Sequence, residues 1–167
     1  MIYTRQRITI EYVEAEDRIR LACEAGEKTL VLWLTQRLMN RLIPHLCQWL
    51  DQRVGASLLT EVKQEFAQQK ARAQLAPQPP VRADAETHGV LVHSVDLKSS
   101  RASMGLQFKE ANGNVIASLQ LQPKPLRQWL NIVYDQCLHA GWPASVWPAW
   151  VAEAKPPATA SRAAVLH

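Results

Sequence analysis

Hydrophobic and polar residues alternate strictly near the start of the chain. Residues 7–13 (R-I-T-I-E-Y-V) and residues 18–24 (R-I-R-L-A-C-E) each place apolar side chains on one face and charged ones on the other. This period of two is typical of strands with one buried face, and the E-A-E-D turn between them predicts an antiparallel pair. The positions expected to face inward are Ile8, Ile10, Tyr12, Ile19, Leu21 and Cys23.

The next segment changes from a strand pattern to a helix pattern. Residues 29–34 (T-L-V-L-W-L) have bulky side chains on both faces, which predicts a strand that is covered on both sides. Thr35 can cap a following helix, and Pro44 inside that helix predicts a kink or a break. The apolar stripe of this helix is expected at Leu38, Leu42, Leu46 and Trp49 or Leu50.

A second helix is predicted after residues 54–56, with Ser57 as its cap. Its narrow apolar stripe consists of Leu58, Leu59, Val62 and Phe66. The polar run that follows, residues 68–74, indicates a helix end that projects or frays. Three prolines and little apolar bulk in residues 75–88 predict a linker or an exposed loop.

The pattern then restarts. We expect strands at residues 89–97, 102–109 and 115–121, with an Asn112-Gly113 hairpin between the last two. Pro123 and Pro125 fit the first turn of a helix that ends at Gly141 and Pro143. Its apolar face comprises Leu126, Trp129, Leu130, Val133, Tyr134, Cys137 and Leu138. From about Ala152 the composition predicts a disordered tail.

The two runs resemble each other, since each has three strands followed by a helix. With one inserted residue at the second helix start, Leu32, Leu34, Leu42 and Leu50 align with Leu119, Leu121, Leu130 and Leu138. We therefore predict an α+β fold of two β-meander-plus-helix halves (βββα, βββα) that share one core, with mostly antiparallel sheet. The predicted parts are residues 1–74, a linker at 75–88, residues 89–151 and a tail at 152–167. The pattern leaves open one continuous six-stranded sheet or two facing sheets.

Composition and charge narrow the class of protein only slightly. The chain has 47% hydrophobic residues and a net charge of +4 that is scattered, which is weak evidence for a nucleic-acid or membrane partner. Cys23, Cys47 and Cys137 lie far apart and are odd in number, as expected in a reducing compartment. Without a signal-peptide pattern or a long apolar run, the sequence predicts a cytoplasmic protein.

Motifs for catalysis are absent from the sequence. No phosphate-binding glycine loop and no nucleophile elbow occur, so we expect no cofactor. The two residues of each pair, His45/Cys47 and Cys137/His139, would lie on different faces of a helix, which is evidence against a metal site. Cys23 and His93 are the best available nucleophile pair, but no third group is evident to orient them. An enzyme of unrecognised type therefore ranks last among three hypotheses.

Arginines are the strongest argument for the second hypothesis, a nucleic-acid-binding protein. Arg5, Arg7, Arg18 and Arg20 should lie on the outer face of neighbouring strands, where they could bind phosphates. The same alternation also predicts cross-strand pairs with glutamates, which would leave an ordinary solvated sheet surface.

The leading hypothesis is a non-catalytic accessory or adaptor protein that binds another protein or itself. Three tryptophans, Trp142, Trp147 and Trp150, occur among prolines in residues 140–151, and they either pack back on the core or anchor a partner. Phe66, on the projecting helix, is the other candidate contact. We therefore assign these four residues as candidate protein-binding residues.

Overall fold

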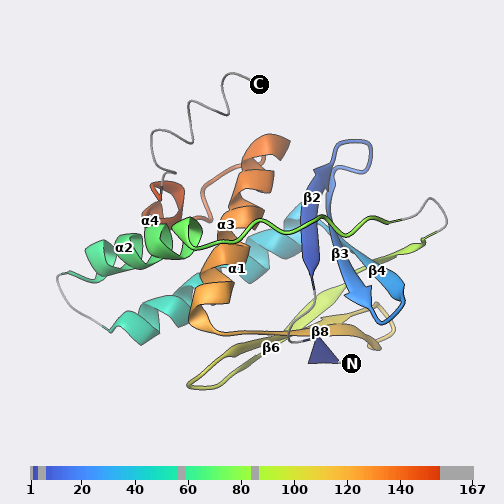
Figure 1. Cartoon of the computed structure of the whole chain (residues 1–167), viewed down its shortest axis with the longest axis horizontal. Helices are drawn as coiled ribbons and strands as arrows, with labels where there is room; N and C mark the ends of the chain where they lie inside the picture. The colour runs from blue at the N-terminus through green and yellow to red at the C-terminus, as the bar shows by residue number, and fades with distance from the viewer. Residues whose placement is uncertain (1, 4–6, 56–58, 84–86, 155–167) are drawn as a thin grey trace.

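The computed structural model describes residues 2–3, 7–55, 59–83 and 87–154 of the chain. Its first half contains β1 (Ile2–Tyr3), β2 (Ile8–Val13), β3 (Arg18–Ala25), β4 (Lys28–Leu34) and α1 (Gln36–Val54), followed by α2 (Thr60–Ala73). Its second half contains β5 (Gly89–Leu91), β6 (Ser94–Ser99), β7 (Met104–Lys109), β8 (Val115–Leu121) and α3 (Pro123–Ala140), followed by the short α4 (Ala149–Ala152). The α+β fold predicted from the sequence is confirmed (Figure 1).

The strands form two sheets of four, with the orders β2-β3-β4-β5 and β1-β8-β7-β6. Each sheet is an antiparallel meander of its own half, extended by a short parallel strand that comes from the other half. β5 pairs with β4, and β1 pairs with β8. The sequence left open one continuous six-stranded sheet or two sheets, and the structure has two separate sheets, each of which includes one short strand from the other half.

The segment 89–97, which the sequence predicts to be one strand, is two strands in different sheets. β5 ends at Leu91, and β6 begins at Ser94. Between them, the N–H of Val92 donates to the backbone carbonyl of Trp33 in the first sheet. The N–H of His93 donates to the backbone carbonyl of Lys109 in the second sheet. The single-strand prediction was wrong because an apolar alternation does not reveal which sheet provides the hydrogen bonds.

The two halves repeat with a shift of 87 residues in their exchanged strands, their last strands and their long helices. The helix caps Thr35 and Gln122 differ by this number (122 − 35 = 87). The exchanged strands keep the same shift, since Tyr3 pairs with Leu119 and Val90 pairs with Leu32. No inserted residue is needed, so the predicted insertion was wrong.

Buried positions on α1 and α3 follow the same shift. The pairs that are buried in both helices are Met39/Leu126, Leu42/Trp129, Ile43/Leu130, Leu46/Val133, Cys47/Tyr134 and Leu50/Cys137. Leu138, which the sequence alignment matched to Leu50, is 51% exposed. The helical phase that buries a side chain is therefore a better guide to equivalence than the identity of the leucines.

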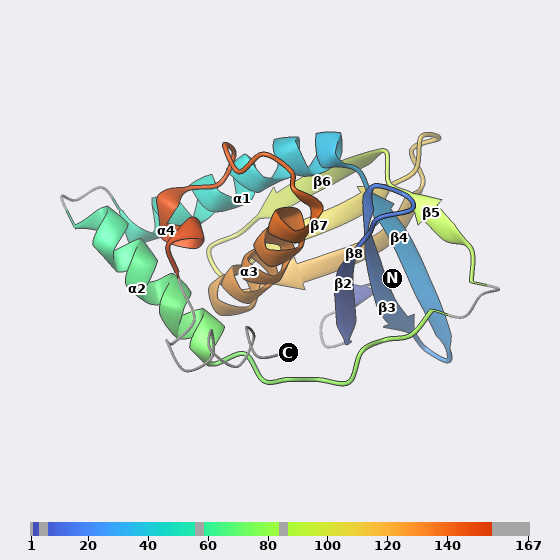
Figure 2. The same cartoon turned by 90° about the horizontal axis from the view of Figure 1, so that it is seen from above.

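Both halves contribute to one core. Its buried residues come from β2–β4 and α1 as well as from β7, β8 and α3. Burial of each large apolar side chain stabilises the fold by about 1.5–3 kcal/mol. Each long helix also contacts the first meander strand of the other half, α3 beside β2 and α1 beside β6 (Figure 2). At the first of these contacts, the N–H of Tyr12 donates to Gln136 Oε1 at 2.8 Å.

The proline-rich segment after α2 packs on the outer face of the first sheet. Val81 is buried against Ala22 and Val31, and its N–H donates to Thr9 Oγ1 at 2.7 Å. This contact covers β4 on its second face, as its sequence predicted. Beyond the segment, Gly89 passes so close to the Trp33 indole that a Cβ atom would lie 2.0 Å from Nε1, so any other residue would displace the indole.

Pro44 does not break α1, which continues from Gln36 to Val54. The hydrogen bond that the proline cannot make would involve the carbonyl of Asn40, and both residues are exposed. Water can therefore hydrate that carbonyl, which explains why the predicted break is absent.

Candidate protein-binding surface

Helix α2 lies against α3, α4 and the end of α1, away from both sheets (Figure 2). Its buried residues are Gln64, Gln68 and Ala71, so the side of the helix that packs on the protein is mainly polar. Helices usually turn their apolar side inward and their polar side toward solvent. In α2 this arrangement is reversed.

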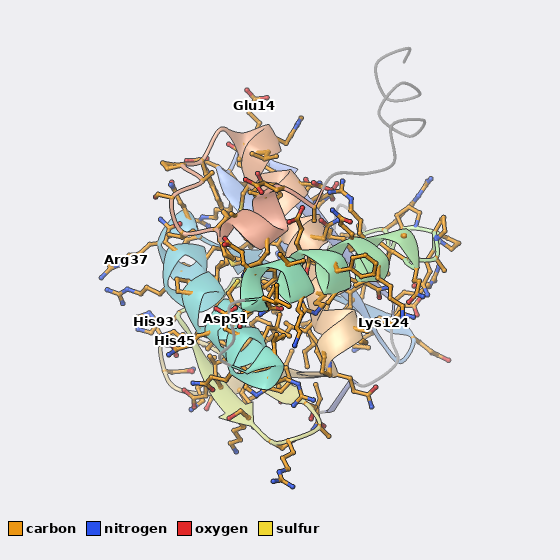
Figure 3. All side chains as sticks on the ribbon, turned by 90° about the vertical axis from the view of Figure 1, so that its left-hand side faces the viewer. Glu14, Arg37, His45, Asp51, His93 and Lys124 are labelled. Carbon is orange, nitrogen blue, oxygen red and sulfur yellow. The ribbon has the colours of Figure 1, made fainter. Side chains whose placement is uncertain are left out.

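Gln64 links the two halves beneath α2. Its Nε2 donates to Asp51 Oδ1 at 2.7 Å, and its Oε1 accepts from Nη2 of Arg127 on α3. Asp51 lies near the end of α1, close to α2 (Figure 3). The amide thus connects a buried cation with a carboxylate that belongs to the other half.

Arg127 is a buried charge with an aromatic neighbour. Its guanidinium carbon lies 5.3 Å from the ring centre of Trp150, and burial lowers its pKa to about 10, against the opposing effect of Asp51. It remains protonated at neutral pH. Within the described residues, Arg127 Nη1 and Gln68 Oε1 are buried and make no hydrogen bond, which reduces the stability gained from this contact by about 1–3 kcal/mol each.

The C-terminal end of α2 is also fixed to the protein. Arg72 Nη1 donates to Asn131 Oδ1 at 3.2 Å and to the carbonyl of Ala154 at 2.8 Å, and Arg72 forms an ion pair with Asp135 at 3.6 Å. Burial raises the pKa of Asp135, whereas Arg72 opposes that rise. The predicted fraying of this end is therefore wrong, because its polar residues are anchors and not a solvated terminus. The proposed cap Ser57 lies outside the described residues.

Three apolar side chains, two in α2 and one at its N-cap residue Leu59, are exposed to solvent. Leu59, Val62 and Phe66 are 59%, 61% and 72% exposed. They are separated by three and four residues, which places them in one row along the helix. We call these three residues the outer row. Phe66, a protein-binding candidate from the sequence, is the most exposed of the three.

Lysines border the outer row on one side. Lys63 and Lys70 are seven residues apart, and hence on the same side of the helix, and both are exposed. Neither forms an ion pair with another described residue. The surface is therefore apolar along its centre and positively charged at one edge.

The tryptophans proposed as partner anchors pack on their own chain. Trp142, Trp147 and Trp150 are all buried in the shared core. Trp142 Nε1 donates to Asp17 Oδ1 at 3.1 Å. The pKa of the Asp17 carboxyl group is lowered mainly by the hydrogen bond from the Tyr12 hydroxyl and secondly by this bond from Trp142. Of the two alternatives, the structure therefore shows the back-packed one, and these side chains are not on an open surface.

The arginine face consists largely of ion pairs. Arg7 pairs with Glu24, Arg20 pairs with Glu11, and Arg18 lies 3.9 Å from Glu16, whereas Arg5 lies outside the described residues. Arg7 also donates to the carbonyl of Pro79 in the segment that covers this sheet. The carboxylates offset much of the positive charge that phosphate binding would require, and the nucleic-acid hypothesis stays an untested prediction.

Cysteine and histidine side chains do not form a reactive pair in the described part of the chain. Cys23, Cys47 and Cys137 are buried, and burial raises the pKa of each thiol, to about 12 for Cys47 and about 11 for Cys137. A reactive cysteine needs a lowered pKa instead. His93 is exposed and shares no contact with Cys23 among the described interactions.

Two further findings concern metals and membranes. Among the described residues, no three side chains of the metal-binding types lie close enough to hold an ion. None of the helices in that part of the chain combines the length and apolarity needed to cross a membrane.

The buried polar contact under α2 is the feature that the sequence analysis missed. Gln64 and Gln68 are four residues apart, as are Arg127 and Asn131, and this spacing puts each pair on one side of its helix. Two such polar pairs on successive helices were the available signal.

Comparison with protein-family models, curated proteins and solved structures finds no match to this chain.

Proposed function

We propose that this protein is a non-catalytic accessory or adaptor protein that binds another protein through the outer row of α2. The observation that carries the proposal is the exposure of Leu59, Val62 and Phe66 along one side of a helix whose opposite side is fixed by polar contacts. Exposed apolar residues that are contiguous, unlike scattered ones, commonly mark an interaction site.

The orientation of α2 supports a binding role better than a structural one. Burying Gln64 and Gln68 in place of Val62 and Phe66 gives up apolar burial worth about 1.5–3 kcal/mol for each large side chain. The fold keeps the helix in this orientation through Asp51, Arg127 and Arg72. A rigid helix that already displays its apolar side loses little entropy when a partner binds.

The charge beside the outer row specifies the chemistry of the partner. Lys63 and Lys70 favour a partner with carboxylates along one border of its apolar contact, because complementary charges select partners and speed their association. An amphipathic helix with leucine-like residues and a row of Glu or Asp meets this requirement. We take such a helix as the proposed partner.

Photo-cross-linking from position 66 tests the proposal. A benzophenone amino acid at this position should form a covalent adduct with a partner in cells, and the cross-linked peptide should be apolar with acidic residues beside it. The same amino acid at Leu138, an isolated exposed apolar residue on α3, is the matched control and should form no such adduct. Exchanging Lys63 and Lys70 for Glu should reduce the adduct at 66 about tenfold.

Two outcomes would contradict the proposal. Adducts of equal yield and identity from positions 66 and 138 would show that exposure alone explains them. No adduct from position 66, while the variant remains folded, would show that the outer row has no partner under those conditions.

Two finer proposals complete this assignment. Three buried free thiols fit a reducing compartment, and we place the protein in the cytoplasm on that basis. The constant shift of 87 residues in strand register, helix cap and buried positions supports an origin of the two halves by internal duplication.

A further inference from the structure

A groove of about 1000 Å³ lies on a different part of the molecule from the outer row of α2. Its walls are the start of β2, the end of β8, the first turns of α3 and residues 74–80 of the proline-rich segment. Apolar side chains, among them Leu119, Leu121, Trp129 and Ile132, provide much of its lining. Both halves of the chain therefore contribute to it.

The edge of β2 faces this groove with unused backbone groups. Within the described chain β2 pairs only with β3, so its other edge has no strand partner. The N–H of Tyr12 points to that open edge, because it donates to Gln136 of α3. Backbone N–H and C=O groups of alternate residues in a strand point to the same edge, so those of Ile8 and Ile10 also point to the open edge of β2 that faces the groove.

Positive charge lies at the opposite wall. Lys124, in the first turn of α3, lines the groove, is exposed and has no ion pair among the described residues (Figure 3). It also lies at the positive end of the dipole of this 18-residue helix. Pro123 and Pro125 have no N–H to offer, so the lysine is the main group that could hold an anion there.

A polar atom without a partner lies in the same wall. Trp129 lines the groove, and its Nε1 is buried without a hydrogen-bond acceptor in the described part of the chain. Buried indole N–H groups usually find an acceptor. This buried N–H is not open to the groove, which itself combines the unpaired edge of β2, apolar walls and the cation of Lys124.

We propose that this groove binds a short extended peptide of a partner protein, which adds as a strand to the open edge of β2. Its main chain pairs with Ile8 and Ile10, alternate apolar side chains contact Leu119 and Leu121, and a carboxylate side chain lies at Lys124. Strand addition obtains affinity from main-chain hydrogen bonds and specificity from alternate side chains. Only one acidic position is specified, because the lining contains one unpaired cation.

Selection from a random peptide library displayed on phage, against the full-length protein, tests this proposal. The enriched peptides should alternate apolar residues and contain Asp or Glu at a fixed place. Synthetic, fluorescently labelled copies should bind at least about tenfold more weakly to a Lys124→Glu variant and to a Leu75→Trp variant, which fills the groove from its exposed rim. Both substitutions are at exposed positions, so folding should be retained.

Two control variants separate this site from the surface on α2. Leu138→Trp adds the same bulk elsewhere on α3, and Phe66→Ala shortens the outer row; neither should change binding of the selected peptides. Binding lost in Phe66→Ala would assign the peptides to α2 and overturn the groove proposal. Retained affinity in Lys124→Glu and Leu75→Trp, or no enrichment at all, would also overturn it.

Competition experiments identify the occupant. A synthetic peptide of residues 155–167, or unlabelled protein added as a second copy, should not displace the selected peptides. Displacement by either would replace the proposed partner with this chain itself and overturn the proposal.

Discussion

Helices α1 and α3 occupy equivalent places in the two halves, yet their outer sides differ. Their buried positions match at the shift of 87 residues, as with Ile43 and Leu130. On the opposite side, Arg127 and Asn131 of α3 are buried beneath α2, whereas the equivalent Asn40 and Pro44 of α1 are exposed. The inner sides are alike, and the outer sides differ.

This difference separates what maintains the fold from what the second half adds to it. The inner positions must fill one shared core at close packing, which restricts them to side chains of suitable shape. Outer positions are free of that requirement. On α3 they bear the polar groups that fix α2, and α2 in turn displays the outer row.

The largest effect is expected at the matched inner positions. Leu130→Ala and Ile43→Ala should each lower the free energy of unfolding by about 2–5 kcal/mol, since both side chains are fully buried in the same core. Leu138→Ala should change it by less than about 0.5 kcal/mol. Urea denaturation measures all three. A large loss at Leu138 with little loss at Leu130 would restore the alignment with one inserted residue.

An intermediate effect is expected at the contact that exists only on α3. Gln64→Leu removes the acceptor of Arg127 and the donor to Asp51, and it should lower the free energy of unfolding by about 1–3 kcal/mol. Gln69→Leu, on the exposed side of the same helix, is the matched control with little effect. The same denaturation assay compares them. Equal stability of the two variants would mean that the polar contact does not hold α2.

Sequence patterns predicted the elements whose neighbours are close in the chain. Strict alternation identified β2, β3 and β7, and Thr35 does cap α1, with its Oγ1 accepting from the N–H of Leu38 at 3.2 Å. Gly141 ends α3 in a left-handed conformation, as its position indicated. In these cases local periodicity and capping chemistry are enough to predict the type of element and where it begins or ends.

Contacts between the halves were beyond such patterns. β1 is two residues long and pairs with β8 more than a hundred residues later, so no period could reveal it. The sequence indicated a projecting helix but not which side of α2 is buried, because the burial of Gln64 and Gln68 depends on Arg127, which lies far along the chain. The candidate Phe66 was identified by its place on the predicted projecting helix, whereas the lysines beside it and Lys124 were not identified at all.

The smallest expected effect gives the most direct test of the central claim that α2 turns its apolar row to solvent. Phe66→Ala should leave the free energy of unfolding within about 0.5 kcal/mol of the unsubstituted protein, because the ring is 72% exposed and alanine is a good helix former. Urea denaturation at low protein concentration measures this change. A loss of about 3–5 kcal/mol, the cost of truncating a buried phenylalanine, would show that the ring packs inside the protein and would contradict the account.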